Sequence, residues 1–82
     1  MRIIDLNSSE GNVFSLLGIS RSWAKQININ PPDLAVVKRE DGSFRPAENY
    51  NEVLDNFDAF WQHRIDYEFL HDPRKQEEDD EE

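Results

Sequence analysis

The sequence predicts a small, mostly α-helical domain, because two segments repeat apolar residues at helical spacing. The longer helix is expected over about residues 47–70, and four of the nine aromatic residues of the chain lie in its first part. We expect Phe57 and Trp61 to be largely buried there. At 100° per residue the apolar side chains of this segment share one broad face: Tyr50, Val53, Leu54, Phe57, Phe60, Trp61 and Ile65.

A second amphipathic helix is expected over about residues 8–27, after a short N-terminal strand. Residues 2–6 are rich in β-branched side chains and alternate weakly, which favours a strand. Ser8 or Ser9 can accept hydrogen bonds from the free N–H groups of a helix start, and Glu10 complements the helix dipole. The apolar stripe of this helix has the spacing of a core-facing helix: Val13, Leu16, Leu17, Ser20, Trp23, Ala24 and Ile27.

Glycine and proline interrupt this second helix at two places. Gly18 lies inside it and costs about 1 kcal/mol relative to alanine. A surface position or the close approach of another helix would explain this glycine, and so would space for a ligand or partner. Pro31 and Pro32 end the helix, because the residue before a proline is pushed out of the α region.

The segment after Pro32 allows two interpretations. Our main prediction is a short middle helix that this proline begins. Two adjacent valines and the turn signature Asp41–Gly42 also suit a β-hairpin of residues 35–39 and 43–45. With residues 2–6 as a third strand, this alternative gives a small sheet and an α+β fold.

The long helix should stop facing the core near Ile65, although we expect the helix itself to reach Leu70. Beyond Ile65, the side chains of Phe69 and Leu70 rotate by about 100° or more away from the apolar face. Tyr67, Phe69 and Leu70 therefore either pack locally through a bend or form an exposed patch of the kind that marks partner surfaces.

The formal net charge of −9 is concentrated at the end of the chain. Residues 77–82 are six consecutive acids, so residues 1–76 hold twelve acids against nine bases. A block of like charges repels itself and buries no apolar surface, which predicts disorder. We therefore expect one compact domain over residues 1–72 and a disordered acidic tail over residues 73–82.

Motifs for catalysis and cofactor binding are missing from the sequence. The chain has no cysteine, no glycine-rich phosphate loop and no nucleophile motif. His63 and His71 are too few for a histidine metal site and are better explained by an exposed helix face. We therefore predict no enzyme, no cofactor and no metal site.

Carboxylates are the groups that we single out for partner binding. Glu52, Asp55 and Asp66 are expected along one exposed row of the long helix. Such a row can present charge to a DNA-binding groove as phosphates do, although solvation of the helix back explains the same pattern. Scattered basic residues and the acidic tail argue against direct nucleic-acid binding. The predicted partner-binding site comprises Glu52, Asp55, Asp66, Tyr67, Phe69 and Leu70.

Two segments carry a resemblance to known proteins. Residues 3–14 read Ile-Ile-Asp-Leu-Asn-Ser-Ser-Glu-Gly-Asn-Val-Phe, and residues 49–54 read Asn-Tyr-Asn-Glu-Val-Leu. In these segments the chain resembles a group of small uncharacterised bacteriophage-encoded proteins. The resemblance covers about the first sixty residues and implies a phage accessory protein, without a particular activity.

These observations predict a non-enzymatic protein-binding module that modulates or inhibits a host enzyme. The alternatives are an acidic DNA-mimic protein, a small ligand-binding subunit and a structural subunit that assembles as a homo-oligomer. No apolar run is long enough for a secretion signal or a membrane span. We therefore expect a cytoplasmic address and no membrane contact.

Overall fold

The computed structural model describes residues 1–75, and within them two helices alternate with four short strands. The fold is therefore α+β, and the prediction of a mostly α-helical domain is wrong. In chain order the elements are β1 (Arg2–Asp5), the 3-10 turn η1 (Ser9–Gly11), α1 (Val13–Gln26), β2 (Val36–Lys38), β3 (Phe44–Pro46), α2 (Tyr50–Trp61), β4 (Tyr67–Leu70) and the 3-10 turn η2 (Pro73–Lys75).

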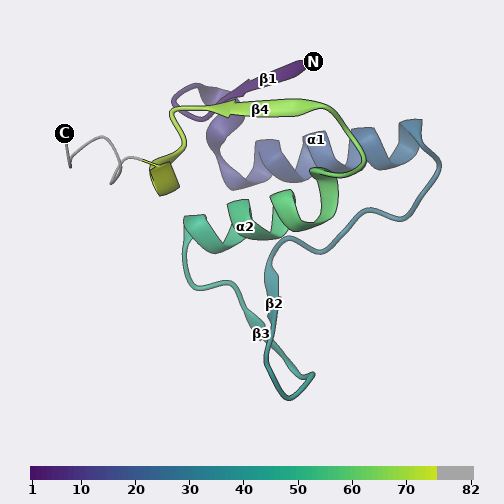
Figure 1. Ribbon diagram of the computed structural model, residues 1–82, viewed down its shortest axis with the longest axis vertical. Coiled ribbons are helices and arrows are strands. Elements are labelled where there is room, and N and C mark those ends of the chain that lie inside the picture. Colours follow the sequence, from purple (N-terminus) through teal and green to yellow (C-terminus); the bar gives the residue numbers. More distant parts are fainter. Residues whose placement is uncertain (76–82) are drawn as a thin grey trace.

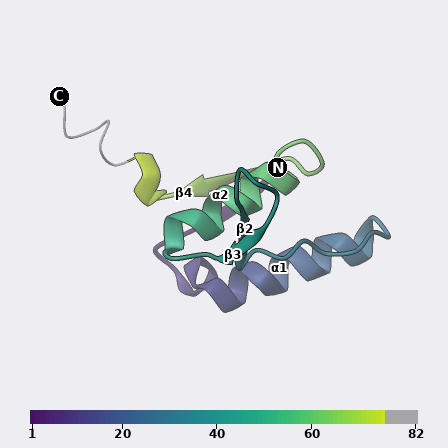
Figure 2. The ribbon, with the colours of Figure 1, turned by 90° about the horizontal axis from the view of Figure 1, so that it is seen from below.

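The four strands form two separate two-stranded sheets. β1 and β4 pair in parallel, with Ile4 opposite Phe69, while β2 and β3 form an antiparallel hairpin. In Figure 1 both helices lie below the β1–β4 pair, and the hairpin extends further down, away from that pair. The view from below shows α2 and β4 next to each other, with η2 at the end of β4 (Figure 2).

The predicted short middle helix is replaced by the hairpin β2–β3. Its β-branched valines favour an extended backbone, and Gly42 adopts the left-handed φ of 91° that its turn requires. The side chain of Asp41 stabilises this turn by accepting a hydrogen bond from the Ser43 backbone N–H at 2.9 Å. The alternative α+β prediction had these two strands, but it paired them with residues 2–6. In the structure β1 pairs with β4 instead.

The long helix ends at Trp61, nine residues before the predicted end at Leu70. The backbone N–H of Ile65 and that of Arg64 both donate to the Trp61 carbonyl, which closes the last turn. The Arg64 side chain also donates to the Phe60 carbonyl at 2.6 Å. After this turn, burial alternates with a period of two over residues 67–70. This is the pattern of a strand, in which every second side chain faces the helices.

The core lies between the two helices and the β1–β4 pair. The predicted burial of Phe57 and Trp61 is confirmed, since both are 0% exposed. The indole N–H of Trp61 donates to the Ser20 hydroxyl at 2.9 Å, which explains a serine inside the apolar stripe of α1. Side chains from every layer complete this core: Ile4, Leu16, Trp23, Ala24, Leu34, Val53 and Leu54.

The structure describes only the first part of the predicted acidic tail. Residues 73–75 form η2 beside α2, whereas residues 76–82 of the predicted acidic tail lie outside the described residues. The predicted boundary between residues 1–72 and 73–82 stays a prediction. Among residues 1–75, neither helix is long and apolar enough to cross a membrane.

Candidate functional site: the groove between α2 and β4

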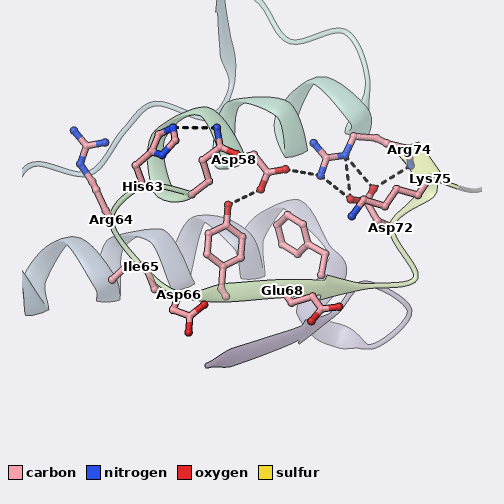
Figure 3. A pocket seen from close by; sticks show the side chains of 12 residues that line it. Asp58, His63, Arg64, Ile65, Asp66, Glu68, Asp72, Arg74 and Lys75 are labelled. Carbon is pink, nitrogen blue, oxygen red and sulfur yellow. Dashed lines mark hydrogen bonds and ion pairs between the residues drawn. The ribbon is translucent and has the colours of Figure 1, made fainter.

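A groove of about 480 Å³ opens between the C-terminal half of α2 and the strand β4. Its walls come from α2, from the α2–β4 connection, from β4 and from η2, as Figure 3 shows. We call it the α2–β4 groove. Its lining consists of Asp58, Gln62, His63, Arg64, Ile65, Asp66, Tyr67, Glu68, Phe69, Asp72, Arg74 and Lys75.

Arg74 is the centre of an ion-pair network at one end of this groove. Its guanidinium donates to Asp72 at 2.6 Å, to Asp58 at 2.7 Å and to Asp55 at 2.9 Å. Asp72 is the most buried of the three, with a side chain that is 3% exposed. Hydrogen bonds from Arg74 lower the pKa of Asp72 below its usual value and outweigh the opposing effect of burial. The network therefore fixes η2 against α2 in its charged form.

Tyr67 connects this network to the strand. Its hydroxyl donates to the second oxygen of Asp58, so Asp58 bridges β4 and Arg74 (Figure 3). Burial, and then the hydrogen bond to Asp58, raises the pKa of Tyr67 well above its usual value. The phenol therefore keeps its proton at neutral pH and acts as a hydrogen-bond donor.

The two histidines lie in different places. His71 follows β4, and its Nδ1 is 2.8 Å from a carboxylate oxygen of Asp5. His63 lines the α2–β4 groove, with its Nε2 3.5 Å from the Gln62 amide. Within residues 1–75, no group of three or more histidine, aspartate or glutamate side chains is arranged to hold a metal ion.

The six residues predicted to bind a partner separate into two sets. Asp66, Tyr67 and Phe69 line the α2–β4 groove, and Asp55 joins its edge through Arg74. Leu70 lies on the outer face of β4 and is 39% exposed. Glu52 points to the hairpin instead.

Glu52 forms an ion pair within the domain. The Arg45 guanidinium binds both of its carboxylate oxygens, and the Glu48 backbone N–H donates to one of them at 2.7 Å. These hydrogen bonds lower the pKa of Glu52 to about 2. Asp66 follows the end of α2, so Glu52, Asp55 and Asp66 do not form the single helical row that the sequence suggested.

Sequence reasoning did not select Asp58, Asp72 and Arg74, which organise this site. Asp55 and Asp58 are three residues apart and share a face of α2, which is a signal for a common cation. The predicted tail over residues 73–82 includes Arg74, so this residue was not expected to contact the domain. Only the path of β4 brings Arg74 to Asp58, a pair sixteen residues apart in the chain.

We expect Arg74→Met to destabilise the protein by about 2 kcal/mol at pH 7. Removing one partner of a buried ion pair costs roughly 3–5 kcal/mol, and the contact of Asp55 and Asp58 with water reduces this cost. Urea denaturation measures the change. The double variant D72N/R74M, which also removes the buried charge, should recover part of the loss.

For the same variant we predict that the loss of stability depends on pH. The folded-state pKa of Asp72 is depressed, so its stabilising contribution is present above its unfolded pKa and is lost as the pH falls through the folded value. The stability difference between wild type and R74M should therefore shrink as the pH falls below about 4, the ordinary pKa of aspartate. A constant difference down to pH 2 would contradict the ion-pair explanation.

No protein-family model, curated protein sequence or solved structure matches this chain. By its fold and its site, the protein is a small α+β domain with a polar groove beside a parallel strand pair.

Proposed function

We propose that this protein is a non-enzymatic protein-binding module, and that the α2–β4 groove receives a basic segment of its partner. The observation that carries the proposal is a pair of free carboxylates, one just before β4 and one within it. Asp66 and Glu68 are exposed and line the groove, and neither side chain has an ion-pair or hydrogen-bond partner among residues 1–75. Two basic side chains of a partner can neutralise them.

The charges around these carboxylates support the same proposal. The groove lining contains four acids and three bases, a net charge of −1. Arg74 is already shared by three carboxylates, and Arg64 lies over the Phe60 ring at 4.2 Å. Residues 77–82 add six acids that begin two residues after Lys75 in the sequence. Charge of this sign accelerates association with basic surfaces.

The protonation states in the groove favour binding over catalysis. General acids and bases work best with a pKa near the operating pH. In this groove the pKa of Asp72 is lowered and that of Tyr67 is raised, so both shifts lead away from neutrality. Buried side-chain nitrogen and oxygen atoms of residues 1–75 all have hydrogen-bond partners, which is typical of a structural network.

The resemblance to phage proteins extends the proposal to the partner. A small phage accessory protein that carries an acidic groove is suited to bind a basic surface of a host enzyme and to modulate or inhibit that enzyme. The proposed location is then the host cytoplasm. The half-buried aromatic rings of Tyr67 and Phe69 would supply contact area beside the charges.

Affinity capture with charge-reversal variants tests this proposal. The tagged full chain is compared with D66K/E68K, which removes the two free carboxylates of the groove. The control E40K/E48K makes the same change in charge at exposed positions outside the groove. We expect the wild type and the control to retain one basic protein in stoichiometric amount, and D66K/E68K to lose it.

Salt and truncation separate the groove from the tail. Retention by the wild type should fall as the salt concentration rises past 0.1 M, where charges are screened over about 10 Å. A chain that ends at Gln76 should retain the same protein more weakly, because it keeps the groove and lacks the six acids. Equal retention by wild type and D66K/E68K, or no retained protein at all, would refute the proposed function.

A further inference from the structure

We infer that the α2–β4 groove binds its partner by strand addition, in which an extended, lysine- or arginine-rich segment pairs with the free edge of β4. This inference rests on the proposed function and specifies the conformation and chemistry of the bound segment. The backbone of β4, the course of the groove and the charge of the strand each support it.

The backbone of β4 has one edge occupied and one edge open. The N–H of Arg2 donates to the carbonyl of Asp66, and the N–H of Leu6 donates to that of Leu70, both at 3.0 Å. In an extended strand, successive backbone groups point to opposite edges. The N–H and C=O groups of Tyr67 and Phe69 therefore point away from β1, and no group within residues 1–75 pairs with them, since β4 has β1 as its one described neighbour.

The groove runs along this open edge. Its lining includes every residue from Ile65 to Phe69, although the side chains of neighbouring strand residues point to opposite faces. Consecutive residues of a strand line the same groove only when the groove lies beside the strand edge. Figure 3 shows β4 below α2 with the groove residues on both faces of the strand and β1 on its other side.

An extended peptide is the ligand that fits such an edge. Exposed strand edges bind partner strands through main-chain hydrogen bonds, while alternate side chains of the added strand enter pockets and give specificity. The outer face of β4 offers the free carboxylate of Glu68, two residues after that of Asp66, whereas Asp58 and Asp72 are already bound by Arg74. Lysine or arginine at alternate positions of the added strand therefore meets an opposite charge.

The same charges disfavour a second copy of this chain as the added strand. Two β4 strands that paired at this edge would bring Asp66 and Glu68 of one copy against those of the other, and like charges opposite each other destabilise a sheet. Residues 77–82, which are all acidic, are disfavoured for the same reason. A basic segment of a different protein is the occupant that we propose.

Backbone methylation of a peptide probe tests strand addition directly. The probe is a synthetic peptide of four lysine–valine repeats, titrated into the isotope-labelled full chain. Two derivatives carry N-methyl groups on all lysines or on all valines, and each derivative removes the N–H groups of one edge only. We expect one derivative to bind at least about tenfold more weakly than the parent peptide, since several main-chain hydrogen bonds are lost, and the other to bind within about threefold.

Amide hydrogen exchange on the protein provides the second measurement. Saturation with the parent peptide should slow the exchange of the Tyr67 and Phe69 amides by at least about tenfold. The amides of Glu68 and Leu70 face β1 and are the internal control, because they should change little. A peptide with the lysines and valines in two separate blocks keeps the composition without the alternation and should bind more weakly.

The outcomes distinguish this inference from the proposed function. Equal binding of both methylated derivatives, with unchanged exchange at Tyr67 and Phe69, would refute strand addition. So would the absence of any binding by the parent peptide at saturating concentration. In both cases the proposed function still stands if D66K/E68K alone loses the captured basic protein, and it fails together with strand addition if no variant differs in capture.

Discussion

Replacing Phe57 by alanine is expected to lower the free energy of unfolding by about 3–5 kcal/mol. The ring is completely buried and packs against Trp23, Tyr67 and Phe69 with centroid distances of 5.3 to 5.5 Å. Truncation of a buried phenylalanine costs about 3–5 kcal/mol. Domains of this size have total stabilities of about 4–12 kcal/mol, so the loss is a large fraction of the total, and it equals the whole stability at the low end of this range.

Circular dichroism during thermal and urea denaturation measures this loss. Phe14→Ala is the matched control, because it makes the same chemical change on α1 at a side chain that is 85% exposed. We expect the control to stay within about 0.5 kcal/mol of wild type. A Phe57→Ala protein that melts at the wild-type temperature would contradict the assignment of this helix face to the core.

Gly11→Ala is expected to cost about 3 kcal/mol, because the chain passes itself closely at this glycine. An added Cβ would lie 2.1 Å from the carbonyl oxygen of Leu6 and 2.7 Å from its Cα, both backbone atoms. Backbone cannot move aside as a flexible side chain does, so overpacking at this point displaces the connection between β1 and α1. The displacement would also disturb the Gly11 carbonyl, which accepts a hydrogen bond from the Tyr50 hydroxyl.

Gly18→Ala, the same substitution at another position, is expected to raise the stability. Gly18 lies within α1, is exposed, and has nothing within 4 Å of an added Cβ among the described residues. Alanine should therefore stabilise the helix by about 0.5–1 kcal/mol. Urea denaturation of the two variants side by side decides the matter. If Gly18→Ala destabilised as strongly as Gly11→Ala, the described packing of α1 would be wrong.

The helical core was predictable because its signal is local. A helix places residues three and four positions apart on one face, so the apolar spacing from Tyr50 to Trp61 identified both α2 and the face that it buries. The same rule identified α1, although its start moved to Val13 behind η1. These elements need no knowledge of distant residues.

The strand β4 was not predictable in the same way. Residues 67–70 are too few for a period of two to be distinguished from the end of a helix, and their strand partner lies 65 positions away, with Arg2 opposite Tyr67. The rotation of Phe69 and Leu70 off the apolar face was the local sign that the helix had ended. A parallel pairing of this kind depends on how both helices pack beneath it.

The candidate site depends on this pairing almost entirely. From the sequence came the residue types, namely carboxylates beside aromatic rings near the end of α2, and four of the six predicted residues gather at the α2–β4 groove or its edge. The sequence could not separate the engaged carboxylates from the free ones. Glu52 pairs with Arg45, whereas Glu68 has no such partner among residues 1–75. This difference depends on the positions of the hairpin and of β4 in the folded protein.

By itself, the sequence determined the two amphipathic helices, the buried aromatic residues and the acidic balance of the chain, because composition and helical periodicity act over a few neighbouring residues. The tertiary structure decided that residues 67–70 are a strand, that Arg74 joins Asp55, Asp58 and Asp72, and that β4 pairs with β1 and borders a groove. Hydrogen bonds and ion pairs between distant segments form only after the helices have packed, so no local pattern encodes them.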